Sequence, residues 1–588
     1  MKPVFLLYNA GEDGSPKIKD YFEVMLHGLP LDLSTAGYLT AFPLLLMLVS
    51  CFVWYPFMKC VLRVYYAVTA FLLSVILCVD CALYSFWQFK LDATIFNYID
   101  SPAEALASVS PGFVLLGVLA TVALAALFFF VLKQVRLPEF HSDKRAWLSL
   151  GPLVLLGGIL FVFVRGGLGK STMNIGSAYY SDCQFYNHAA VNPAFSLLAS
   201  SLKTKDFSKL YRFYDGQECS RLFAEMKYDT RTVRPDSLLN TSRPNVLIIL
   251  MEGFGATFIE PLGGEPGVTP CFNRLAGEGV LFSQCYANSF RTDRGTVCAF
   301  SGYPAFPGFS IMKMPQKSRT LPSIARTLAG AGYTTDFLYG GDINFTNMNS
   351  YLLSTGYQTV RGDTHFPSSV RKTHAWGVTD RIVFDTLYNQ IVARKQNTPW
   401  FTTFLTLASH EPWVVPYHRI KGNERTNAMA YTDDCLGRFV ERLKRTPAWK
   451  NLLIVCIADH GITYPAGLTE ADKRRYHIPM LWIGGAVKRP RVIEKICNQT
   501  DLPATLLGQM GLGHKDFSFS RDVTSSTYTR PSAIHTFDDG FSLIDSTGYT
   551  VIDFQSGRAL TDLPHPSQQR KAFGQAFLQT AIDDFAKR

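Results

Sequence analysis

The chain has 588 residues, which is too long for one domain, and its first third is far more apolar than the rest. Lysine and arginine number 57 against 47 aspartate and glutamate residues, so the protein is basic. Because no lysine-rich arm or nucleic-acid motif accompanies this excess, we expect no nucleic-acid partner. We attribute the charge to membrane-facing loops and an anionic lipid substrate.

Four apolar runs in the first third are long enough to cross a bilayer, which takes about 20 residues. They lie at 37–57, 64–87, 113–132 and 148–164. Any one of them could be a buried core helix, but four nearly uncharged runs in succession favour membrane helices. Asp80 lies inside the second run, where a charge is costly in lipid, so we expect it to face the helix bundle or an interface.

Basic residues mark the connections after the first and third runs, at Lys59, Arg63 and 133–145, whereas the connection between the second and third runs is acidic. Basic loops stay in the cytoplasm. The pattern predicts a multi-pass protein of the cell (inner or cytoplasmic) membrane, with its large C-terminal part on the extracytoplasmic side, periplasmic or extracellular. Disulfides can persist there, but the spacing of the cysteines does not reveal their pairing.

Strands and helices alternate from Pro244 onward. Strands are predicted at 246–251, 280–286, 334–339, 400–407, 452–458, 479–483 and 549–554, and helices at 271–279, 321–331, 428–444 and 568–585. Such alternation indicates a mostly parallel sheet covered on both faces. The predicted parts are an N-terminal segment (1–36), a transmembrane domain of four helices (37–165), a connector (166–243), a catalytic domain (244–560) and a C-terminal helix (561–588).

Four residues can together build a metal-activated nucleophile. Glu252 and the pair Asp459–His460 each follow a buried strand, and Thr292 lies near a helix start. Side chains at the carboxyl ends of parallel strands converge on a ligand. Two carboxylates, an imidazole and a hydroxyl suit one divalent cation, which would make the hydroxyl an alkoxide able to attack phosphorus or sulfur esters. A lone acid after a strand can be a simple helix cap, but the agreement of all these settings favours a metal site.

The motifs MEGFG, SFRTDRG and ADHG carry these residues, and their order along the chain resembles that of the alkaline phosphatase/sulfatase superfamily. Within it, the chain resembles the lipoteichoic acid synthase-like phosphoglycerol transferases. The resemblance implies an α-helical membrane bundle followed by an α/β sulfatase-like domain with a mostly parallel sheet. It also implies that Glu252, Thr292, Asp459 and His460 bind one divalent metal ion, with Mn²⁺ favoured and Zn²⁺ or Mg²⁺ left open.

Three hydroxyls near the predicted helix start are candidate nucleophiles: Ser289, Thr292 and Thr296. A helix N-terminus stabilises an anion, and Thr296 lies one turn too far into the helix. In the resembled family a small-hydroxyl-plus-Gly turn follows the nucleophile at the spacing that separates Thr292 from 301–304. We therefore favour Thr292 as the catalytic nucleophile, although a plain helix cap is the alternative.

Three residues are candidates to bind the phosphate. His410 directly follows a predicted strand, and the resemblance implies that it contacts the phosphate and protonates the leaving alcohol. A structural histidine is the alternative. Arg291 and Arg294 flank Thr292 and could bind phosphate oxygens bidentately, or could be solvated surface residues.

Four more residues are candidates for the substrate pocket. The stretch 340–348 matches the region where the resembled synthases place a His, a Trp and an Arg on glycerol phosphate, and this chain lacks that set. Asp342 and Asn344 are the polar groups left to take over, with loop capping as the alternative. Trp376 is a pocket wall or a core aromatic, and His477, before a predicted strand, is a further pocket candidate.

By resemblance, the chain is a metal-dependent transferase that moves a phosphoglycerol, or a similar phospho-alcohol, from a phospholipid to a glycan or glycolipid through a phospho-threonine. The alternatives are a phosphoethanolamine transferase and a membrane-tethered sulfatase or phosphodiesterase. A sulfatase is disfavoured because it normally presents Cys or Ser, not Thr, as the nucleophile precursor. A catalytically dead sensor is disfavoured because every expected metal ligand is present. The donor, the acceptor and the oligomeric state are not fixed by the sequence.

The start of the chain carries one further expectation. The resembled family usually has five membrane helices, and the short apolar stretch 4–8 resembles the end of its first helix. Five residues at 1.5 Å each span far less than a bilayer. The chain therefore either begins outside the cell with four helices or lacks an upstream helix. We expect the missing helix, because an exterior N-terminus without its own signal is the less common arrangement.

Overall fold

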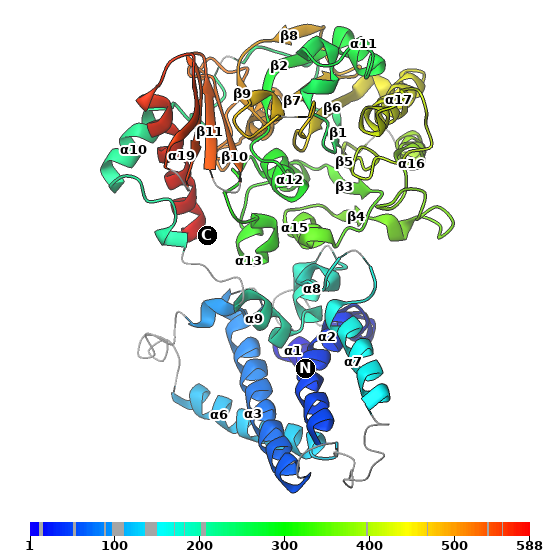
Figure 1. Cartoon of the computed structure of the whole chain (residues 1–588), viewed down its shortest axis with the longest axis vertical. Helices are drawn as coiled ribbons and strands as arrows, with labels where there is room; N and C mark the ends of the chain where they lie inside the picture. The colour runs from blue at the N-terminus through cyan, green and yellow to red at the C-terminus, as the bar shows by residue number, and fades with distance from the viewer. Residues whose placement is uncertain are drawn as a thin grey trace. The chain divides into compact units, whose positions relative to one another are not determined.

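The computed structural model describes most of the chain. The described residues are 1–10, 16–50, 55–87, 90–96, 111–135, 150–169, 171–181, 183–201, 207–233, 235–394, 398–466, 468–537, 540–554 and 557–588. The chain divides into two compact units, which we call the apolar unit (Met1–Lys205) and the globular unit (Asp206–Arg588). Their elements are labelled in Figure 1.

The apolar unit is helical. Its longer helices are α2 (Ile18–Ser50), α3 (Tyr55–Trp87), α6 (Pro111–Leu132) and α7 (Leu150–Arg165), and its shorter ones are α1 (Lys2–Tyr8), α8 (Gln184–Ala190) and α9 (Pro193–Ser201). In the described part of the chain, α2, α3 and α6 contain stretches long and apolar enough to cross a membrane. Helix α7 covers residues 150–164 of the fourth predicted run (148–164), whose first two residues lie outside the described part, and it is a shorter apolar helix. Among the described residues, three helices are therefore long enough to cross a membrane, and α7 coincides with the fourth predicted run.

Helix α2 begins much earlier than the predicted first membrane run. Polar residues in its first half are satisfied by neighbours: Asp32 forms an ion pair with Lys2 and accepts a hydrogen bond from Asn192 Nδ2 at 2.8 Å. Asp80 of α3 is buried, forms an ion pair with the buried Lys90 and accepts a hydrogen bond from Leu91 N at 3.0 Å. The expectation that Asp80 faces the protein interior is confirmed. Most of the predicted basic connection 133–145 lies outside the described residues. Lys59 and Arg63, which were predicted to lie in the connection after the first run, are instead part of α3.

The globular unit is built on a nine-stranded sheet in the order β4-β3-β5-β1-β6-β7-β2-β8, with β9 beside β2. The strands are β1 (Asn245–Met251), β2 (Val280–Tyr286), β3 (Thr334–Tyr339), β4 (Thr359–Arg361), β5 (Trp400–Leu405), β6 (Leu452–Ala458), β7 (His477–Ile483), β8 (Arg491–Ile493) and β9 (Cys497–Asn498). Among the described strands of this sheet, only β7 runs antiparallel to its neighbours. The predicted mostly parallel sheet is confirmed.

Burial on both faces explains why the central strands are almost continuously apolar. Every residue of β6, and every residue of β1 after Asn245, is buried. The helices of the unit are α10 (Gly216–Glu225), α11 (Pro270–Glu278), α12 (Thr292–Ser301), α13 (Pro315–Ser318), α14 (Ile324–Gly330), α15 (Met348–Ser354), α16 (Asp380–Ala393), α17 (Glu424–Lys444), α18 (Leu502–Gln509) and α19 (Gln568–Lys587). Helices α11 and α16 pack on α17, whereas α14 and α18 pack on α12.

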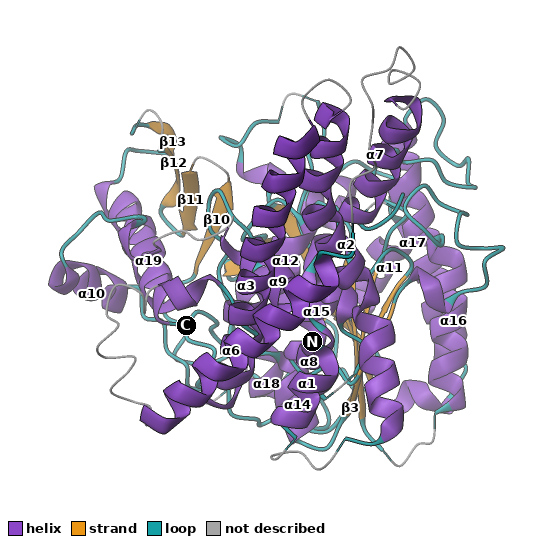
Figure 2. Ribbon diagram, turned by 90° about the horizontal axis from the view of Figure 1, so that it is seen from below, coloured by secondary structure: helices purple, strands orange, loops and turns teal. Residues whose placement is uncertain are grey.

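A second, antiparallel sheet of β10 (Ser532–Phe537), β11 (Gly540–Asp545), β12 (Gly548–Asp553) and β13 (Ala559–Leu563) completes the globular unit. Of these strands the sequence predicted only β12. Helix α19 packs against β11 and α10, as Figure 2 shows from below. The predicted C-terminal helix and the second half of the predicted connector are therefore parts of this unit. For example, Tyr214 N donates to Gln579 Oε1 at 3.0 Å.

Candidate active site

Glu252, Asp459 and His460 meet at the carboxyl ends of β1 and β6. The two strands are paired in parallel up to Met251 and Ala458, so the acids that follow them start side by side. One potential ligand atom from each of the three residues lies within 4.8 Å of the others, and all three side chains are buried. His460 Nε2 lies 3.4 Å from both Glu252 Oε1 and Asp459 Oδ2. The convergence expected for strand-end residues is thus present.

Backbone contacts orient these side chains toward one point. Asp459 Oδ1 accepts hydrogen bonds from Gly253 N and His460 N, both at 2.8 Å. Asp459 Oδ2 is buried without a hydrogen-bond partner among the described atoms. His460 Nδ1 donates to the carbonyl of Gly461 at 3.0 Å, which leaves Nε2 to present a lone pair. Two carboxylates and one imidazole nitrogen in a buried position fit a divalent cation, and this donor set does not select among Mn²⁺, Zn²⁺ and Mg²⁺.

The three groups perturb one another strongly. Burial raises the pKa of Glu252, but the hydrogen bond and charge of His460 outweigh it and hold that pKa well below its usual value. Burial and the charge of Glu252 raise the pKa of Asp459. Burial lowers the pKa of His460, but Asp459 and Glu252 outweigh it and raise it to about 9. Without a cation, the cluster therefore retains protons at neutral pH.

Thr292 is the hydroxyl that reaches this cluster. It is the first residue of α12, it is half-buried, and its Oγ1 donates to Glu252 Oε2 at 2.9 Å. Thr296 is fully buried, and its Oγ1 has no hydrogen-bond partner among the described atoms. Ser289, also fully buried, donates instead to the carbonyl of Thr536 at 3.3 Å. The contacts therefore favour Thr292 among the three candidates.

Three residues that sequence reasoning missed hold this arrangement in place. A Cβ atom on Gly295 would lie 2.0 Å from the carbonyl oxygen of Asp459, so only glycine lets α12 approach the end of β6 this closely. Gln499 Nε2 donates to the carbonyls of Ala458 and Asp459, both at 2.8 Å. Thr406 Oγ1 accepts from Glu252 N at 2.9 Å. An isolated glycine inside a helix can signal close packing, whereas Gln499 and Thr406 carry no local signal.

His410 lies on the turn after β5, near the cluster. Its charge is one of those that lower the pKa of Glu252, after burial and the stronger effects of His460. Its Nδ1 donates to the carbonyl of Glu411 at 2.9 Å, which leaves Nε2 for a substrate. The turn is held by the buried Asp380, whose Oδ1 accepts from Leu407 N and Ala408 N at 2.8 and 3.2 Å.

Trp376 forms a wall beside His410. Their ring centroids are 4.4 Å apart, and Trp376 Nε1 donates to the carbonyl of Glu411 at 2.6 Å. Phe345 also meets Trp376 edge-on, with ring centroids 5.5 Å apart. Since Trp376 and Phe345 are partly exposed, they form an aromatic surface continuous with His410.

The other residues predicted to bind the substrate differ in burial and in their contacts. Arg294 is buried with its guanidinium 4.9 Å from the ring of Phe290, while Arg291 is exposed. Asp342 Oδ1 accepts from Asn344 N at 2.9 Å, which is a loop-capping contact.

Tyr339 lies near both the loop that contains Asp342 and the cluster formed by Glu252 and Asp459. Its pKa is raised by burial first and then by the charges of Glu252, Asp459 and Asp342, which therefore all lie near it. His477 is instead tied to β2. Its Nε2 lies 2.9 Å from the carbonyl of Ser283, and burial lowers its pKa to about 4.

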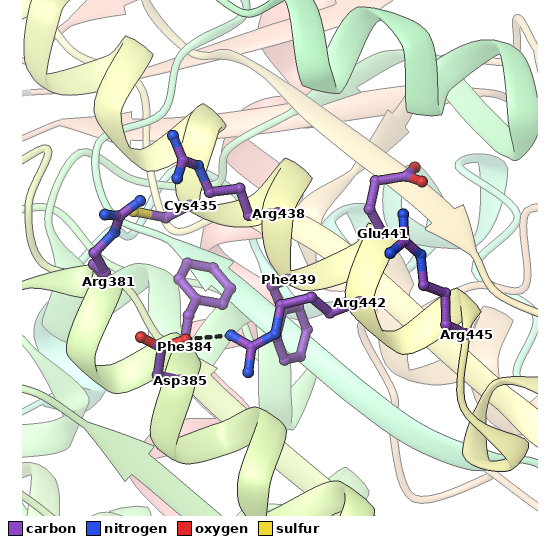
Figure 3. A pocket seen from close by; sticks show the side chains of 9 residues that line it. All are labelled: Arg381, Phe384, Asp385, Cys435, Arg438, Phe439, Glu441, Arg442 and Arg445. Atoms are coloured by element: carbon purple, nitrogen blue, oxygen red, sulfur yellow. Dashed lines mark hydrogen bonds and ion pairs between the residues drawn. The ribbon is translucent and has the colours of Figure 1, made fainter.

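A separate groove of about 450 Å³ lies between α16 and α17 (Figure 3). It is lined by Arg381, Phe384, Asp385, Cys435, Arg438, Phe439, Glu441, Arg442 and Arg445. Its arginines are partly neutralised: Arg442 forms an ion pair with Asp385, and Arg438 with Asp434 at 2.8 Å. The Glu252 cluster is therefore the stronger candidate for catalysis.

Comparison with known proteins agrees with this geometry. Residues 244–512 match the family model described as Sulfatase. Phosphoglycerol transferase I of Xanthomonas campestris pv. campestris (strain ATCC 33913) is 26% identical over 407 residues, covering 64% of this chain and 53% of that protein. Phosphoglycerol transferase I of Escherichia coli (strain 55989) is 24% identical over 295 residues, covering 47% of this chain and 38% of that protein. The chain thus spans about half or less of these relatives' length.

Two solved structures resemble the globular unit. A protein of the alkaline phosphatase superfamily from Vibrio parahaemolyticus superposes with a TM-score of 0.55 at 26% identity, covering 64% of this chain and 98% of that one. The lipoteichoic acid synthase LtaP from Listeria monocytogenes superposes with a TM-score of 0.51 at 18% identity, covering 63% and 98%. The second likeness concerns the fold alone.

Proposed function

Because the chain carries a sulfatase-family domain with the alkaline phosphatase-superfamily fold, we propose that it is a metal-dependent phosphoglycerol transferase of the inner membrane. It moves a phosphoglycerol, or a similar phospho-alcohol, from a phospholipid to a glycan or glycolipid. The observation that carries the proposal is the contact of Thr292 Oγ1 with Glu252 beside Asp459 and His460. The relatives named phosphoglycerol transferase I support the choice of head group.

Enzymes of this superfamily use a divalent metal ion, and the residues that would hold it here are Glu252, Thr292, Asp459 and His460. Bound there, the ion supplies Lewis acidity that stabilises negative charge on the phosphoryl oxygens and on the Thr292 oxygen. Thr292 directs its proton toward Glu252 Oε2, so a lone pair of Oγ1 is available to attack phosphorus. Its place at the start of α12 adds the favourable end of the helix dipole.

The reaction has two displacements at one phosphorus atom. In the first, a bond forms between Thr292 Oγ1 and phosphorus while the bond to the diacylglycerol oxygen breaks, and His410 Nε2 protonates the leaving oxygen. In the second, a bond forms between the acceptor oxygen and phosphorus while the bond to Thr292 Oγ1 breaks. His410 Nε2, deprotonated in the first step, takes the proton of the acceptor hydroxyl, and Glu252 returns the proton that Thr292 Oγ1 gave up. Trp376 and Phe345 cover one side of the pocket beside His410 and help exclude water, which favours transfer over hydrolysis.

The membrane placement follows from the apolar unit. Helices α2, α3 and α6 are long enough to cross the bilayer, and α7 covers the fourth predicted run. Four crossings, with the basic stretch 133–145 between the third and fourth runs on the cytoplasmic side, would leave the chain after α7 outside the cytoplasm. We place the globular unit on the extracytoplasmic side, where phospholipid head groups and envelope glycans meet.

The test uses full-length protein in vesicles that contain phosphatidylglycerol or phosphatidylethanolamine labelled in the head group, with Mn²⁺ and a glycan acceptor. We expect diacylglycerol release and acceptor labelling from phosphatidylglycerol, loss of both in Thr292→Ala, and wild-type activity in Thr386→Ala, a hydroxyl on α16 that bonds only within its helix. Labelling from phosphatidylethanolamine alone would show the phosphoethanolamine transferase instead. Release of water-soluble glycerol phosphate without acceptor labelling would show a hydrolase.

A further inference from the structure

Two buried cysteines lie directly opposite each other across strands β2 and β9. Cys285 and Cys497 are register partners in this parallel pair, and both side chains are fully buried. Adjacent strands are about 4.8 Å apart, which lies within the Cα–Cα range of about 4.4–6.8 Å that a disulfide spans. Both are free thiols in this structure, and the proximity of Cys285, together with burial, raises the pKa of the Cys497 thiol well above its usual value.

The residues beside this pair hold the candidate active site together. Asn498 Nδ2 donates to the carbonyl of Tyr286 at 2.8 Å, and Asn288 Nδ2 donates to Asn498 Oδ1 at 2.8 Å. Gln499, two residues after Cys497, donates to the carbonyl of Asp459 at 2.8 Å. A covalent bond between β2 and β9 would therefore fix the segment leading to Thr292 against the segment that supports Asp459.

Other buried cysteines of the globular unit have different partners. Cys456 pairs with Ile249 on β1 and with Leu481 on β7. Cys298 Sγ lies 3.6 Å from Asn288 Oδ1. These two thiols serve as internal references for cysteines that remain reduced.

We propose that Cys285 and Cys497 form a disulfide bond in the protein in its native membrane. The proposal rests on the extracytoplasmic location given above, because disulfides persist in oxidising compartments. One thiolate attacks an oxidant that carries a disulfide, forming a mixed disulfide and releasing one thiolate of the oxidant. The second protein thiolate then attacks the protein sulfur of that mixed disulfide and displaces the other thiolate of the oxidant. The two cysteines lose two protons and two electrons, and the oxidant leaves as a dithiol.

The bond would constrain most of the globular unit. The residues between Cys285 and Cys497 include α12, β3, β5 and β6. The central parallel strands of the sheet are β3, β5, β1 and β6, so the closed loop contains all of them except β1. A disulfide that closes a long loop removes more conformational freedom from the unfolded chain than one that closes a short loop.

Mass spectrometry of the full-length protein tests the proposal. Cells are lysed in excess N-ethylmaleimide to block thiol exchange, and the protein is denatured and alkylated without reductant before digestion. We expect a cross-linked peptide pair containing Cys285 and Cys497 that separates only after reduction, while Cys298 and Cys456 are alkylated at once. Alkylation of Cys285 and Cys497 without reductant would overturn the proposal.

Two variants identify the partners. In Cys285→Ala, Cys497 becomes alkylated without reductant, whereas Cys456→Ala leaves the cross-linked pair intact. A cross-link of Cys497 to any other cysteine in wild-type protein would also overturn the proposal. Protease accessibility of the globular unit in intact cells and the head-group transfer assay are measured separately. Free thiols at Cys285 and Cys497 would therefore overturn the disulfide alone, because the proposed location and function are tested by these other two measurements.

Discussion

Replacing Gly295 with alanine should separate the candidate nucleophile from the metal cluster. The new Cβ would lie 2.0 Å from the carbonyl oxygen of Asp459 and 2.7 Å from its carbonyl carbon. Both are backbone atoms at the end of a buried strand, so they cannot rotate away. Ordinary contact begins at 3.4 Å, so α12 must withdraw by about 1.4 Å.

A displacement of about 1 Å in a reacting group can cost about 10²-fold in rate, so we expect Gly295→Ala to lower the transfer rate about 100-fold or more. Helix propensity does not cause this loss, since alanine is favoured over glycine in a helix by about 1 kcal/mol. The matched control is Gly277→Ala in α11, where a Cβ would meet nothing within 4 Å, and its activity should equal that of wild type. The assay is diacylglycerol release from labelled vesicles, with a thermal melt of each variant. A Gly295→Ala enzyme that retains wild-type activity would refute the reasoning.

Three further outcomes follow from the same contacts. Glu252→Ala, Asp459→Ala and His460→Ala should each lower bound metal and activity together, and full metal occupancy in all three would contradict a single shared site. Cation affinity should rise as the pH approaches about 9, because binding displaces the proton that His460 holds below that pH, by up to about tenfold per pH unit. Calorimetry should show proton release, and equal affinity at pH 6 and pH 8 would contradict it. Asp380→Ala should destabilise the unit by about 2 kcal/mol or more, since it leaves the buried amides of 407–408 without an acceptor, whereas Asp380→Asn should cost less. Equal melting temperatures of those two variants would count against this role of Asp380.

The central sheet could be predicted because its strands are apolar on both faces. The runs that became β1, β2, β3 and β6 have predicted bounds within one residue of those in the structure. The antiparallel strands β10, β11 and β13 were missed because no comparable apolar run marks them. The early start of α2 was also missed, since hydropathy does not register that Asp32 is neutralised by Lys2, a partner far away in the sequence.

Some residues of the candidate site could likewise be predicted from the sequence and others could not. Glu252 and the Asp459–His460 pair could be found from sequence because each follows a strand of recognisable pattern. Gln499 could not, because its role depends on a contact with Asp459 across 40 positions of the chain. Only some of the residues predicted to contact the substrate lie close to one another in the structure. His410 and Trp376 lie together, whereas His477 is tied to Ser283.

The most direct test of the account is the covalent state of Thr292 during turnover. Wild-type protein is mixed with phosphatidylglycerol vesicles and Mn²⁺ without acceptor, quenched in acid within one turnover, digested and analysed by mass spectrometry. We expect a glycerol phosphate adduct on Thr292 that disappears when acceptor is added before the quench. An adduct on Thr296, or turnover with no adduct on the protein, would contradict it.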